Sequence, residues 1–539
     1  MKNQAGRDIP DTVLSNGKEA YQGAYHCDGT EFQRVARKGY AKLTASPEDK
    51  VVHDLKEAVK RVGLKNGMSV SFHHHFRNGD YVVNKVVQAI GELGIKDITI
   101  YASSLGEAHD AILPYIEDGT VTGLSSSGVR GKIGEAISHG LFRDVVYIRS
   151  HGGRVRAVES GDIHIDVAFI GAPSSDCMGN ARGKGGKSNC GVLSYAMIDA
   201  QYADKVVIVT DTLVDFPNFP PAIQAIDVDV VAVVDEIGNP AKIASKEVRY
   251  TDNPKELMMA DYAARFIAHC PNFKDGFSFQ AGAGGAALAV VRCLKQYMAE
   301  KNYKMSFAIG GITAPIVQLL HDGLIKCVVD AQDFDLPSAE SVIDSPGHFE
   351  ISTSQYANPF NKGAFVNMLD FAVLGALEID TDFNVNVIVG SDGIVRGAPG
   401  GHPDAAAGAK VSIIITPLIR SRIPVVIDKV TTVTTPGETV DVLITEEGIA
   451  INPRRTDLIE AMKDSGLPVT TIEALRDKAY RISGAPEPQK LQAVCRPYRP
   501  VYPVQARPYV LNSKGFVFLI TSSTVPSRYS TTATTFSSK

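Results

Sequence analysis

Three consecutive histidines and an arginine occur in the segment HHHFRNGD, residues 73–80, directly after the apolar run SVSF. Side chains alternate in extended chain, so His74 is expected to point away from His73 and His75. This alternation weighs against a metal site, although a metal site and plain structural histidines stay open as alternatives. Arg77 can bind a carboxylate or phosphate through two parallel hydrogen bonds. We therefore predict an anionic substrate site here, made by His73, His74, His75, Arg77, Gly79 and Asp80.

A second candidate is the basic, glycine-rich segment GNARGKGGKSNCG at 179–191. Its glycines let backbone N–H groups approach an anion closely, and its side chains add positive charge. A GxGxxG match here is weak evidence for a dinucleotide site, because neither the helix-opening geometry nor a later acidic residue is evident. We predict substrate contacts from Arg182, Lys184 and Lys187; the alternative is a solvated, flexible loop.

Two glycine clusters, QAGAGG at 280–285 and RGAPGGHPD at 396–404, follow apolar runs. N–H groups in such turns can stabilise a developing oxyanion, and each donor contributes about two to three powers of ten in rate. Tight turns without a catalytic role are the alternative. We predict an oxyanion pocket formed by Gly397, Gly400 and Gly401, with substrate contacts from Gly282, Gly284, Gly285 and His402.

The carboxylates Glu446 and Glu447 follow the apolar run VDVLIT. A carboxylate can form a covalent intermediate in acyl transfer, so Glu446 is a candidate catalytic nucleophile. A similar pair, Asp235 and Glu236, follows the run VVAVV earlier in the chain. Because acid occurs at both places, we favour a turn-forming or fold-wide role for this pair over catalysis.

These segments belong to a sequence that repeats itself, which four ordered matches indicate. The matches are GMSVSF with GFSFQA at an offset of 209, EDG with HDG at 204, DKVVIVTD with AKVSIIIT at 205, and VVAVVDEIG with VDVLITEEG at 210. Four matches in order at nearly one spacing predict a tandem duplication, so that each half has the same fold.

The runs rich in Val and Ile are typical of strands covered on both faces. They predict an α/β fold with a mostly parallel sheet in each half, with helices such as 82–93 and 286–298 between the strands. Pro47 after Ser46, and apolar residues at helical spacing beyond it, predict a helix that begins near residue 47. In such folds the loops at the carboxyl ends of the strands bind ligands.

Domain boundaries follow from this layout. We predict an N-terminal segment at 1–46, a first α/β domain at 47–245 and a second at 255–488, with a hinge around 239–254. Residues 489–539 contain no Asp or Glu and seven Lys or Arg, and are rich in Pro, Ser, Thr and Tyr. This composition predicts a disordered or aberrant tail.

Composition narrows the class of protein. With 539 residues, 44 % hydrophobic and 21 % charged, the chain is long enough for two large globular domains. The sequence contains neither an apolar leader nor a run of 18 apolar residues, so we expect a cytoplasmic protein without a membrane span. The net charge of −5 argues against a nucleic-acid surface. The seven cysteines form no CxxC pair, so we predict no zinc site.

The motifs SFHHHFRNGDYV, GNARGKGGKSNCG, QAGAGG, RGAPGGHPD and LITEEGIAINP together resemble the citrate lyase α-chain family, which is similar to the duplicated CoA transferases. The resemblance runs from about residue 20 to about residue 485. The acid-free tail departs from the family, which ends soon after that point in a short apolar, charged strand.

The resemblance implies a citrate CoA-transferase reaction, in which an acetyl thioester on a carrier chain and citrate give a citryl thioester and acetate. The citrate carboxylate is expected to attack the thioester directly through a mixed anhydride, without a glutamyl intermediate. The chain itself then needs no cofactor, because the thiol belongs to a phosphoribosyl-dephospho-CoA group on a γ chain, and a β chain cleaves citryl to oxaloacetate. The alternative activity is that of an acyl-CoA hydrolase or a carboxylate CoA-transferase with a glutamate nucleophile.

Overall fold

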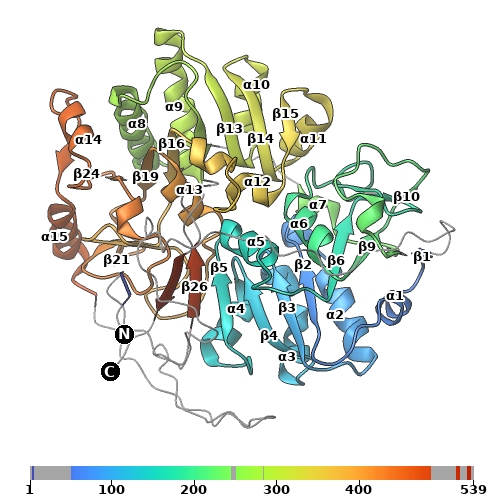
Figure 1. The fold of residues 1–539 in the computed structure, drawn as a ribbon. Coiled ribbons are helices and arrows are strands. Elements are labelled where there is room, and N and C mark those ends of the chain that lie inside the picture. Colours follow the sequence, from blue (N-terminus) through green and yellow to red (C-terminus); the bar gives the residue numbers. More distant parts are fainter. Residues whose placement is uncertain are drawn as a thin grey trace.

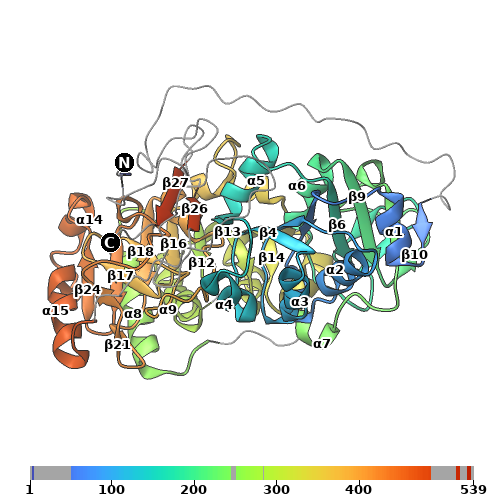
Figure 2. The ribbon, with the colours of Figure 1, turned by 90° about the horizontal axis from the view of Figure 1, so that it is seen from below.

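The computed structural model describes residues 3–4, 50–244, 250–282 and 284–486, and the backbone of 518–522 and 531–535. Two large sheets, one in each half of the chain, form its framework, and Figures 1 and 2 show the two halves side by side. No helix in the described ranges is long and apolar enough to cross a membrane.

The first sheet has ten strands, and its described pairs are parallel except for β26 with β27. In spatial order the strands are β1 (Val51–Val52), β11 (Val230–Val233), β9 (Lys205–Thr210), β6 (Val167–Ala172), β2 (Ser69–Phe72), β3 (Ile98–Ala102), β4 (Val121–Ser126), β5 (Val146–Arg149), β26 (Phe518–Ser522) and β27 (Thr531–Thr535).

The second sheet has nine strands, of which β24 runs antiparallel to β23. In spatial order they are β15 (His348–Glu350), β14 (Ile325–Asp333), β13 (Met305–Ile312), β12 (Phe279–Ala281), β16 (Phe371–Leu374), β19 (Val411–Ile415), β23 (Val442–Thr445), β24 (Gly448–Ile451) and β25 (Val469–Thr470).

Seven strands of each sheet follow the same order, which confirms the predicted duplication of an α/β fold. The order β11-β9-β6-β2-β3-β4-β5 of the first sheet matches β23-β19-β16-β12-β13-β14-β15 of the second. Three of the sequence matches lie on the equivalent pairs β2 with β12, β9 with β19, and β11 with β23, and the fourth directly precedes β4 and β14.

A small sheet beside each large one repeats as well. It contains β10 (Leu213–Val214), β7 (Ser174–Asp176) and β8 (Ala181–Arg182) in the first half, and β22 (Val426–Ile427), β17 (Glu378–Asp380) and β18 (Val385–Asn386) in the second. The Asp176 carboxylate accepts hydrogen bonds from the backbone and side chain of Asn180, and Asp380 does the same with Asn384. The second half also carries the hairpin of β20 (Ile419–Arg420) and β21 (Ile423–Pro424).

Helices cover both faces of the sheets (Figure 1). The first half contains α1 (Leu55–Arg61), α2 (Val82–Glu92), α3 (Leu113–Glu117), α4 (Gly131–His139), α5 (His151–Glu159), α6 (Ser194–Tyr202) and α7 (Pro240–Ile243). The second half contains α8 (Pro254–His269), α9 (Gly285–Lys301), α10 (Ala314–His321), α11 (Leu336–Asp344), α12 (Thr353–Ala357), α13 (His402–Gly408), α14 (Thr456–Ala461) and α15 (Ile472–Ser483). The helices predicted at 82–93 and 286–298 are confirmed as α2 and α9.

Side chains of β16 show why this strand reads as an unbroken apolar run. Phe371 and Val373 pack into one buried cluster with α8 and α9, whereas Ala372 and Leu374 pack into another with α12 and α13. Because successive side chains point to opposite faces of the sheet, a strand covered on both sides is apolar throughout.

The predicted start of the first helix near residue 47 is wrong. Val51 and Val52 form the edge strand β1, which pairs in parallel with β11, and the helix begins only at Leu55 after the N-cap Asp54. The buried ammonium of Lys50 donates to three backbone carbonyls, which fixes the strand. Pairing with a strand 180 residues away overrode the local helical pattern.

The tail predicted to be disordered contains the strands β26 and β27, of which β26 extends the first sheet beyond β5. The remainder of 489–539 lies outside the described residues, as does most of the N-terminal segment 1–46, so the predictions for these parts stay predictions.

Candidate active site

A cavity of about 860 Å³ lies between the two halves, where the carboxyl ends of the two sheets face each other. Loops after β2, β3, β4 and β5 line it from the first half, and loops after β12, β14, β16 and β19 line it from the second. This is where an open parallel sheet binds its ligands. Such a volume is in the range of pockets that bind small molecules.

The loop after β2 brings His74 into the cavity. The His74 backbone N–H donates to Ser103 Oγ at 2.9 Å, which leaves the Ser103 hydroxyl to donate to His74 Nδ1 at 2.6 Å. The proton of a neutral ring is therefore assigned to Nε2, which lies 3.1 Å from Gln332 Oε1 in the second half. Burial and the neighbouring His151 hold the pKa of His74 well below its usual value, so the ring is neutral at neutral pH.

His151 joins His74 at the floor of the cavity. The two rings stack with centroids 5.6 Å apart, and the Tyr195 ring lies 4.7 Å from each. Burial, followed by the charges of Arg154 and Arg130, lowers the pKa of His151 to about 3. Its Nδ1 is buried and has no hydrogen-bond partner among the described residues. The His151 ring lines the cavity and keeps one buried nitrogen without a protein partner among the described residues.

The structure places His73 and His75 below the cavity instead of in it, although we predicted substrate contacts for both. His73 Nε2 lies 2.8 Å from Asp199 Oδ2, and Arg154 pairs with the same carboxylate through both of its terminal nitrogens. His75 Nε2 donates to the Gly171 carbonyl. The alternation of side chains sends these two rings into the core and leaves His74 to face the substrate.

Arg77 also lines the cavity, in a left-handed backbone conformation with φ of +52°. Its guanidinium donates to the Phe334 carbonyl at 2.9 Å and lies 4.5 Å above the Phe334 ring, so it bridges the two halves. These contacts leave further N–H donors for an anion, because a guanidinium has five.

Two other predicted residues of this loop have structural roles. The Asp80 carboxylate accepts from the Val82 N–H at the start of α2 and lies 2.9 Å from His109 Nε2. A Cβ at Gly79 would lie 2.6 Å from the Asn239 carbonyl oxygen, so only glycine fits there.

Three further arginines line the cavity and were missed from the sequence. Arg130 is the N-cap of α4, Arg396 precedes Gly397, and Arg420 follows β19. Arg396 pairs with Asp392, whereas no described residue forms an ion pair with the exposed Arg130. The lining residues contain two carboxylates, Glu107 and Glu256, so the cavity carries an excess of positive charge.

The loop at 396–402 crosses from the second half to the first. The Val129 N–H donates to the Gly397 carbonyl and the His151 N–H to the Gly400 carbonyl. The Gly400 N–H itself donates to the Ser127 carbonyl at 3.2 Å, so it is not available for the oxyanion that we predicted for it. Gly397 and Gly401 line the cavity, where side chains would collide with the Val387 carbonyl and the Tyr356 hydroxyl respectively.

His402 opens α13 and lines the cavity, but its ring is already bonded. Nδ1 lies 2.7 Å from Thr435 Oγ1, and Nε2 donates to the Gly375 carbonyl at 2.7 Å. Burial lowers the pKa of His402 to about 4. The ring therefore holds the loop in place and is less suited to substrate contact than we predicted.

The segment at 280–285 brings the N-terminus of the 17-residue helix α9 to the cavity wall. Gly284 is the N-cap, and because it has no side chain the helix start has no side-chain capping hydrogen bond. A Cβ built on Gly284 would meet no atom within 4 Å, so there is open space beside the start of the helix. A helix N-terminus with free N–H groups stabilises negative charge. Gly282 and Gly285 flank this position in the lining.

The basic segment at 182–187 lies outside the cavity. Arg182 donates to the Phe219 carbonyl, Lys184 to the Val342 carbonyl and Lys187 to the Asp235 carbonyl. None of the three is among the cavity-lining residues that the structure describes. The predicted substrate contacts from this segment are thus not part of the site.

Glu446 is buried beside the cavity but does not line it. Its carboxylate accepts from the Leu418 N–H at 2.8 Å and lies 3.6 Å from Lys255 Nζ. The Val206 N–H donates to Asp229 as the Ser412 N–H donates to Asp441, so Asp229 is the equivalent of Asp441 and Val234 is the equivalent of Glu446. The acid found in both halves is therefore Glu447 with Asp235, so the echo in the first half does not bear on Glu446.

Residues 48–497 match the family model of the citrate lyase alpha subunit (CitF). The citrate lyase alpha chain of Haemophilus influenzae is 50% identical over 463 residues, which cover 86% of this chain and 92% of that protein. The citrate lyase alpha chain of Klebsiella pneumoniae is 50% identical over 439 residues, which cover 81% of this chain and 86% of that protein.

Solved structures also resemble this chain. The alpha subunit of citrate lyase from Streptococcus mutans, crystallised in complex with citrate, superposes with a TM-score of 0.90 at 47% identity, over 100% of both chains. The alpha subunit of a malonate decarboxylase from Acinetobacter baumannii has the same fold at 17% identity, with a TM-score of 0.61 over 80% of this chain and 87% of that chain.

Proposed function

The chain belongs to the citrate lyase alpha-subunit family, the transferase component of citrate lyase, and we propose that it moves an acyl-carrier thiol from acetyl to citrate in the cavity between its halves. In this reaction a citrate carboxylate attacks the acetyl thioester directly. The proposal draws on the family and on the cationic lining of the cavity, and it is supported by the citrate complex of the Streptococcus mutans relative.

One observation carries the mechanism: several cations line the described cavity, whereas Glu446, the candidate nucleophile, does not line it. Glu446, the candidate from the sequence, is buried outside the lining and accepts the Leu418 N–H. Glu107 and Glu256 lie on the lining among four arginines. Citrate brings its own carboxylate, so the enzyme needs to bind it, orient it and stabilise charge.

The first step forms a bond between a citrate carboxylate oxygen and the acetyl carbonyl carbon, and the carrier thiolate leaves. The thiolate then attacks the citryl carbonyl of the mixed anhydride, and acetate leaves with the oxygen that citrate contributed. Both steps pass through a tetrahedral oxyanion. The open N–H groups at the start of α9, and those of Gly397 and Gly401, are the proposed donors to this oxyanion.

Citrate is proposed to bind against the first-half wall. Arg77 and Arg130 provide charge-assisted hydrogen bonds to its carboxylates, and the neutral rings of His74 and His151 provide directional contacts. The chain as a whole has a net charge of −5, so these local cations are what attracts a trivalent anion.

The remaining partners follow from the resemblance. The thiol is proposed to belong to the phosphoribosyl-dephospho-CoA group of a carrier γ chain, whose arm enters the cavity. A lyase β chain is proposed to cleave the citryl thioester. No cofactor of this chain itself is needed for the transfer, and we expect the reaction to take place in the cytoplasm.

A glutamate nucleophile is the rival mechanism, and borohydride distinguishes the two. We expect the chain to keep its activity after incubation with acetyl donor and borohydride, because no glutamyl thioester forms. Glu446→Gln is expected to retain transfer activity within about tenfold, since the amide oxygen can still accept the Leu418 N–H. Two results together would establish the rival mechanism. Borohydride would inactivate the wild type irreversibly only in the presence of the acetyl donor, and the Glu446→Gln variant would have no transfer activity.

A further inference from the structure

A buried cluster of metal-ligand side chains lies in the seam between the halves, outside the cavity. It consists of Asp330 and Asp333 near the end of β14 and His348 at the start of β15. One ligand atom from each residue lies within 4.8 Å of the others. All three side chains are buried, with residual exposures of 0 %, 4 % and 3 %.

Asp333 is the unusual member of this cluster. Neither of its buried carboxylate oxygens accepts a well-aligned N–H or hydroxyl hydrogen bond from a described residue, and its polar neighbours include the Asp330 carboxyl group and the Ser338 side chain, which carry no positive charge. An ionised carboxylate without a partner is costly inside a protein. None of the lysines and arginines in the described part of the chain forms an ion pair with Asp330 or Asp333. A positive charge is what this cluster lacks.

The other two residues are held as metal ligands usually are. His348 Nδ1 lies 3.0 Å from Ser341 Oγ, which leaves Nε2 to face Asp330 Oδ2 at 3.0 Å. The second oxygen of Asp330 accepts from the Gln332 N–H at 2.7 Å. An imidazole oriented through its other nitrogen, and a carboxylate held through its other oxygen, are typical of ligands around a divalent ion.

We propose that Asp330, Asp333 and His348 bind one divalent first-row transition-metal ion, such as Zn(II), through two carboxylate oxygens and His348 Nε2. Ligand distances of about 2.0–2.2 Å would hold the three ligand atoms, which now lie within 4.8 Å of one another, around one ion. One imidazole and two carboxylates suit zinc or manganese better than calcium, which takes six to eight oxygen ligands.

The glycine-rich segment at 179–191 covers this site. A Cβ on Gly191, whose φ is +80°, would lie 1.7 Å from Asp333 Oδ2, so the first-half backbone closes directly over the carboxylate. Nearby, the Leu193 N–H donates to Glu350, and the Ser194 hydroxyl donates to the Asp330 carbonyl. A bound ion would therefore stabilise the contact between the halves, and with it the strand end that carries Gln332.

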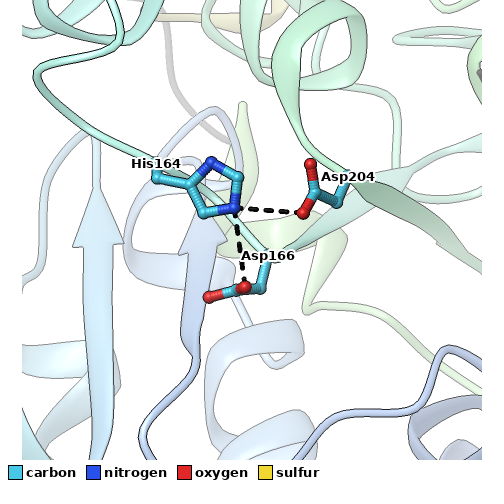
Figure 3. Close-up of side chains that lie close together, drawn as sticks. All are labelled: His164, Asp166 and Asp204. Carbon is cyan, nitrogen blue, oxygen red and sulfur yellow. Dashed lines mark hydrogen bonds and ion pairs between the residues drawn. The ribbon is translucent and has the colours of Figure 1, made fainter. Parts of the chain in front are cut away.

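The exposed cluster of His164, Asp166 and Asp204 serves as a matched comparison (Figure 3). His164 Nε2 lies 3.0 Å from Asp204 Oδ2 and 3.6 Å from Asp166 Oδ1. The other Asp166 oxygen accepts from the backbone and hydroxyl of Ser69. Similar Ser–Asp pairs occur at Ser278 with Asp370 and Ser412 with Asp441, so Asp166 has a structural role in the fold. We propose no ion at this second cluster.

Zinc retention by the full-length chain tests the proposal. The purified protein is incubated with Zn(II), desalted and analysed for metal by mass spectrometry, beside the variants Asp333→Asn and Asp204→Asn. We expect about one zinc per chain in the wild type and in Asp204→Asn, and at least a tenfold loss in Asp333→Asn. Addition of a chelator should lower the melting temperature of the wild type but not that of Asp333→Asn.

Two results would overturn the proposal. If the wild type retains no more zinc than Asp333→Asn, and the variant melts at the same or a higher temperature, the two aspartates share a proton and no ion binds. If Asp204→Asn loses the zinc instead, the ion is a surface contaminant. An Asp333→Asn chain that fails to fold leaves the chelator experiment on the wild type to decide, with an unchanged melting temperature counting against the site. None of these results bears on the transfer reaction.

Discussion

His74 Nε2 lies 3.1 Å from Gln332 Oε1, and this hydrogen bond joins the two halves of the chain at the floor of the cavity. The Ser103 hydroxyl fixes the opposite nitrogen of the ring. Together the two contacts orient the imidazole and keep its proton on Nε2. A neutral, fixed ring is suited to positioning a carboxylate for attack on the thioester.

Gln332→Ala should therefore impair catalysis more than stability. The variant frees His74, and loss of orientation of the reacting groups lowers kcat for citrate by about tenfold to a hundredfold. Steady-state kinetics with acetyl carrier and citrate measure the effect. The control is Gln318→Ala on α10, whose side chain bonds Asp322 on the surface. Equal kinetics of the two variants would refute a positioning role for Gln332.

Arg77→Ala should raise the KM for citrate by about tenfold to a hundredfold, since one charge-assisted hydrogen bond contributes about 1.5–3 kcal/mol. We expect a smaller effect on folding, because the side chain donates a single bond to the Phe334 carbonyl and alanine keeps the backbone strain unchanged. Arg143→Ala is the matched control, since Arg143 pairs with Asp97 and Asp144 at the surface. Unchanged citrate kinetics in Arg77→Ala would remove Arg77 from the site.

Arg130→Ala tests the same wall of the cavity from a second helix. Arg130 forms no ion pair with a described residue, so its removal should cost little stability while raising the KM for citrate at least about tenfold. Citrate binding by calorimetry, together with thermal melting, separates the two effects. A variant that melts early and binds citrate normally would show a structural role only.

Gly284→Ala places one methyl group at the open N-terminus of α9. The backbone φ of −77° suits alanine and no atom lies within 4 Å of the new Cβ, so the melting temperature should change little. The methyl group would keep the oxyanion from the first N–H groups, and we expect kcat to fall at least about tenfold. Gly363→Ala, on an exposed turn outside the cavity, is the control. Normal turnover by Gly284→Ala would exclude α9 from oxyanion stabilisation.

Asp404 predicts a pH dependence of stability. Its carboxyl group lies 2.7 Å from Ser150 Oγ and accepts from the Gly152 N–H, and burial raises its pKa to about 8. The unfolded chain has an aspartate pKa of about 3.9, so unfolding releases a proton between these values and stability falls as the pH rises through them. The slope approaches about 1.4 kcal/mol per pH unit.

Asp404→Asn removes this pH dependence of stability, because the amide mimics the protonated acid. We expect the variant to gain stability over the wild type progressively from pH 5 to pH 8, as measured by chemical denaturation. The exposed Asp382→Asn serves as a control. A difference between Asp404→Asn and the wild type that does not vary with pH would show that Asp404 is ionised in the folded protein.

Local pattern predicted much of the fold. The runs VVIVT and VSIIIT are apolar throughout because both faces of β9 and β19 are covered, so they were predicted as buried strands. The repeat that relates them is visible in the sequence alone. The helix expected at residue 47 failed for the opposite reason. Val51 pairs with Val231 far along the chain, and such a partner leaves no local trace.

The site was predicted in part. Glycine loops after strands led to Gly284 and to the loop at 396–402. His151 carries the same signal, since it follows the apolar run VYIR and precedes two glycines, but it was not singled out. Arg130 and Arg420 have no distinctive neighbours in sequence, and they meet only because two sheets face each other. The basic segment at 182–187 misled because its charge suggested a ligand, whereas its three cationic side chains donate to backbone carbonyls outside the cavity.

The most direct test of direct attack by citrate follows one oxygen atom through a single turnover. Acetyl carrier and enzyme are mixed with citrate labelled with ¹⁸O in its carboxylates, and the released acetate is analysed by mass spectrometry. The proposed mechanism predicts one ¹⁸O atom in the acetate of the first turnover, because the mixed anhydride breaks at the citryl carbon. Unlabelled acetate in the first turnover, with ¹⁸O appearing on a glutamate of the protein, would contradict it.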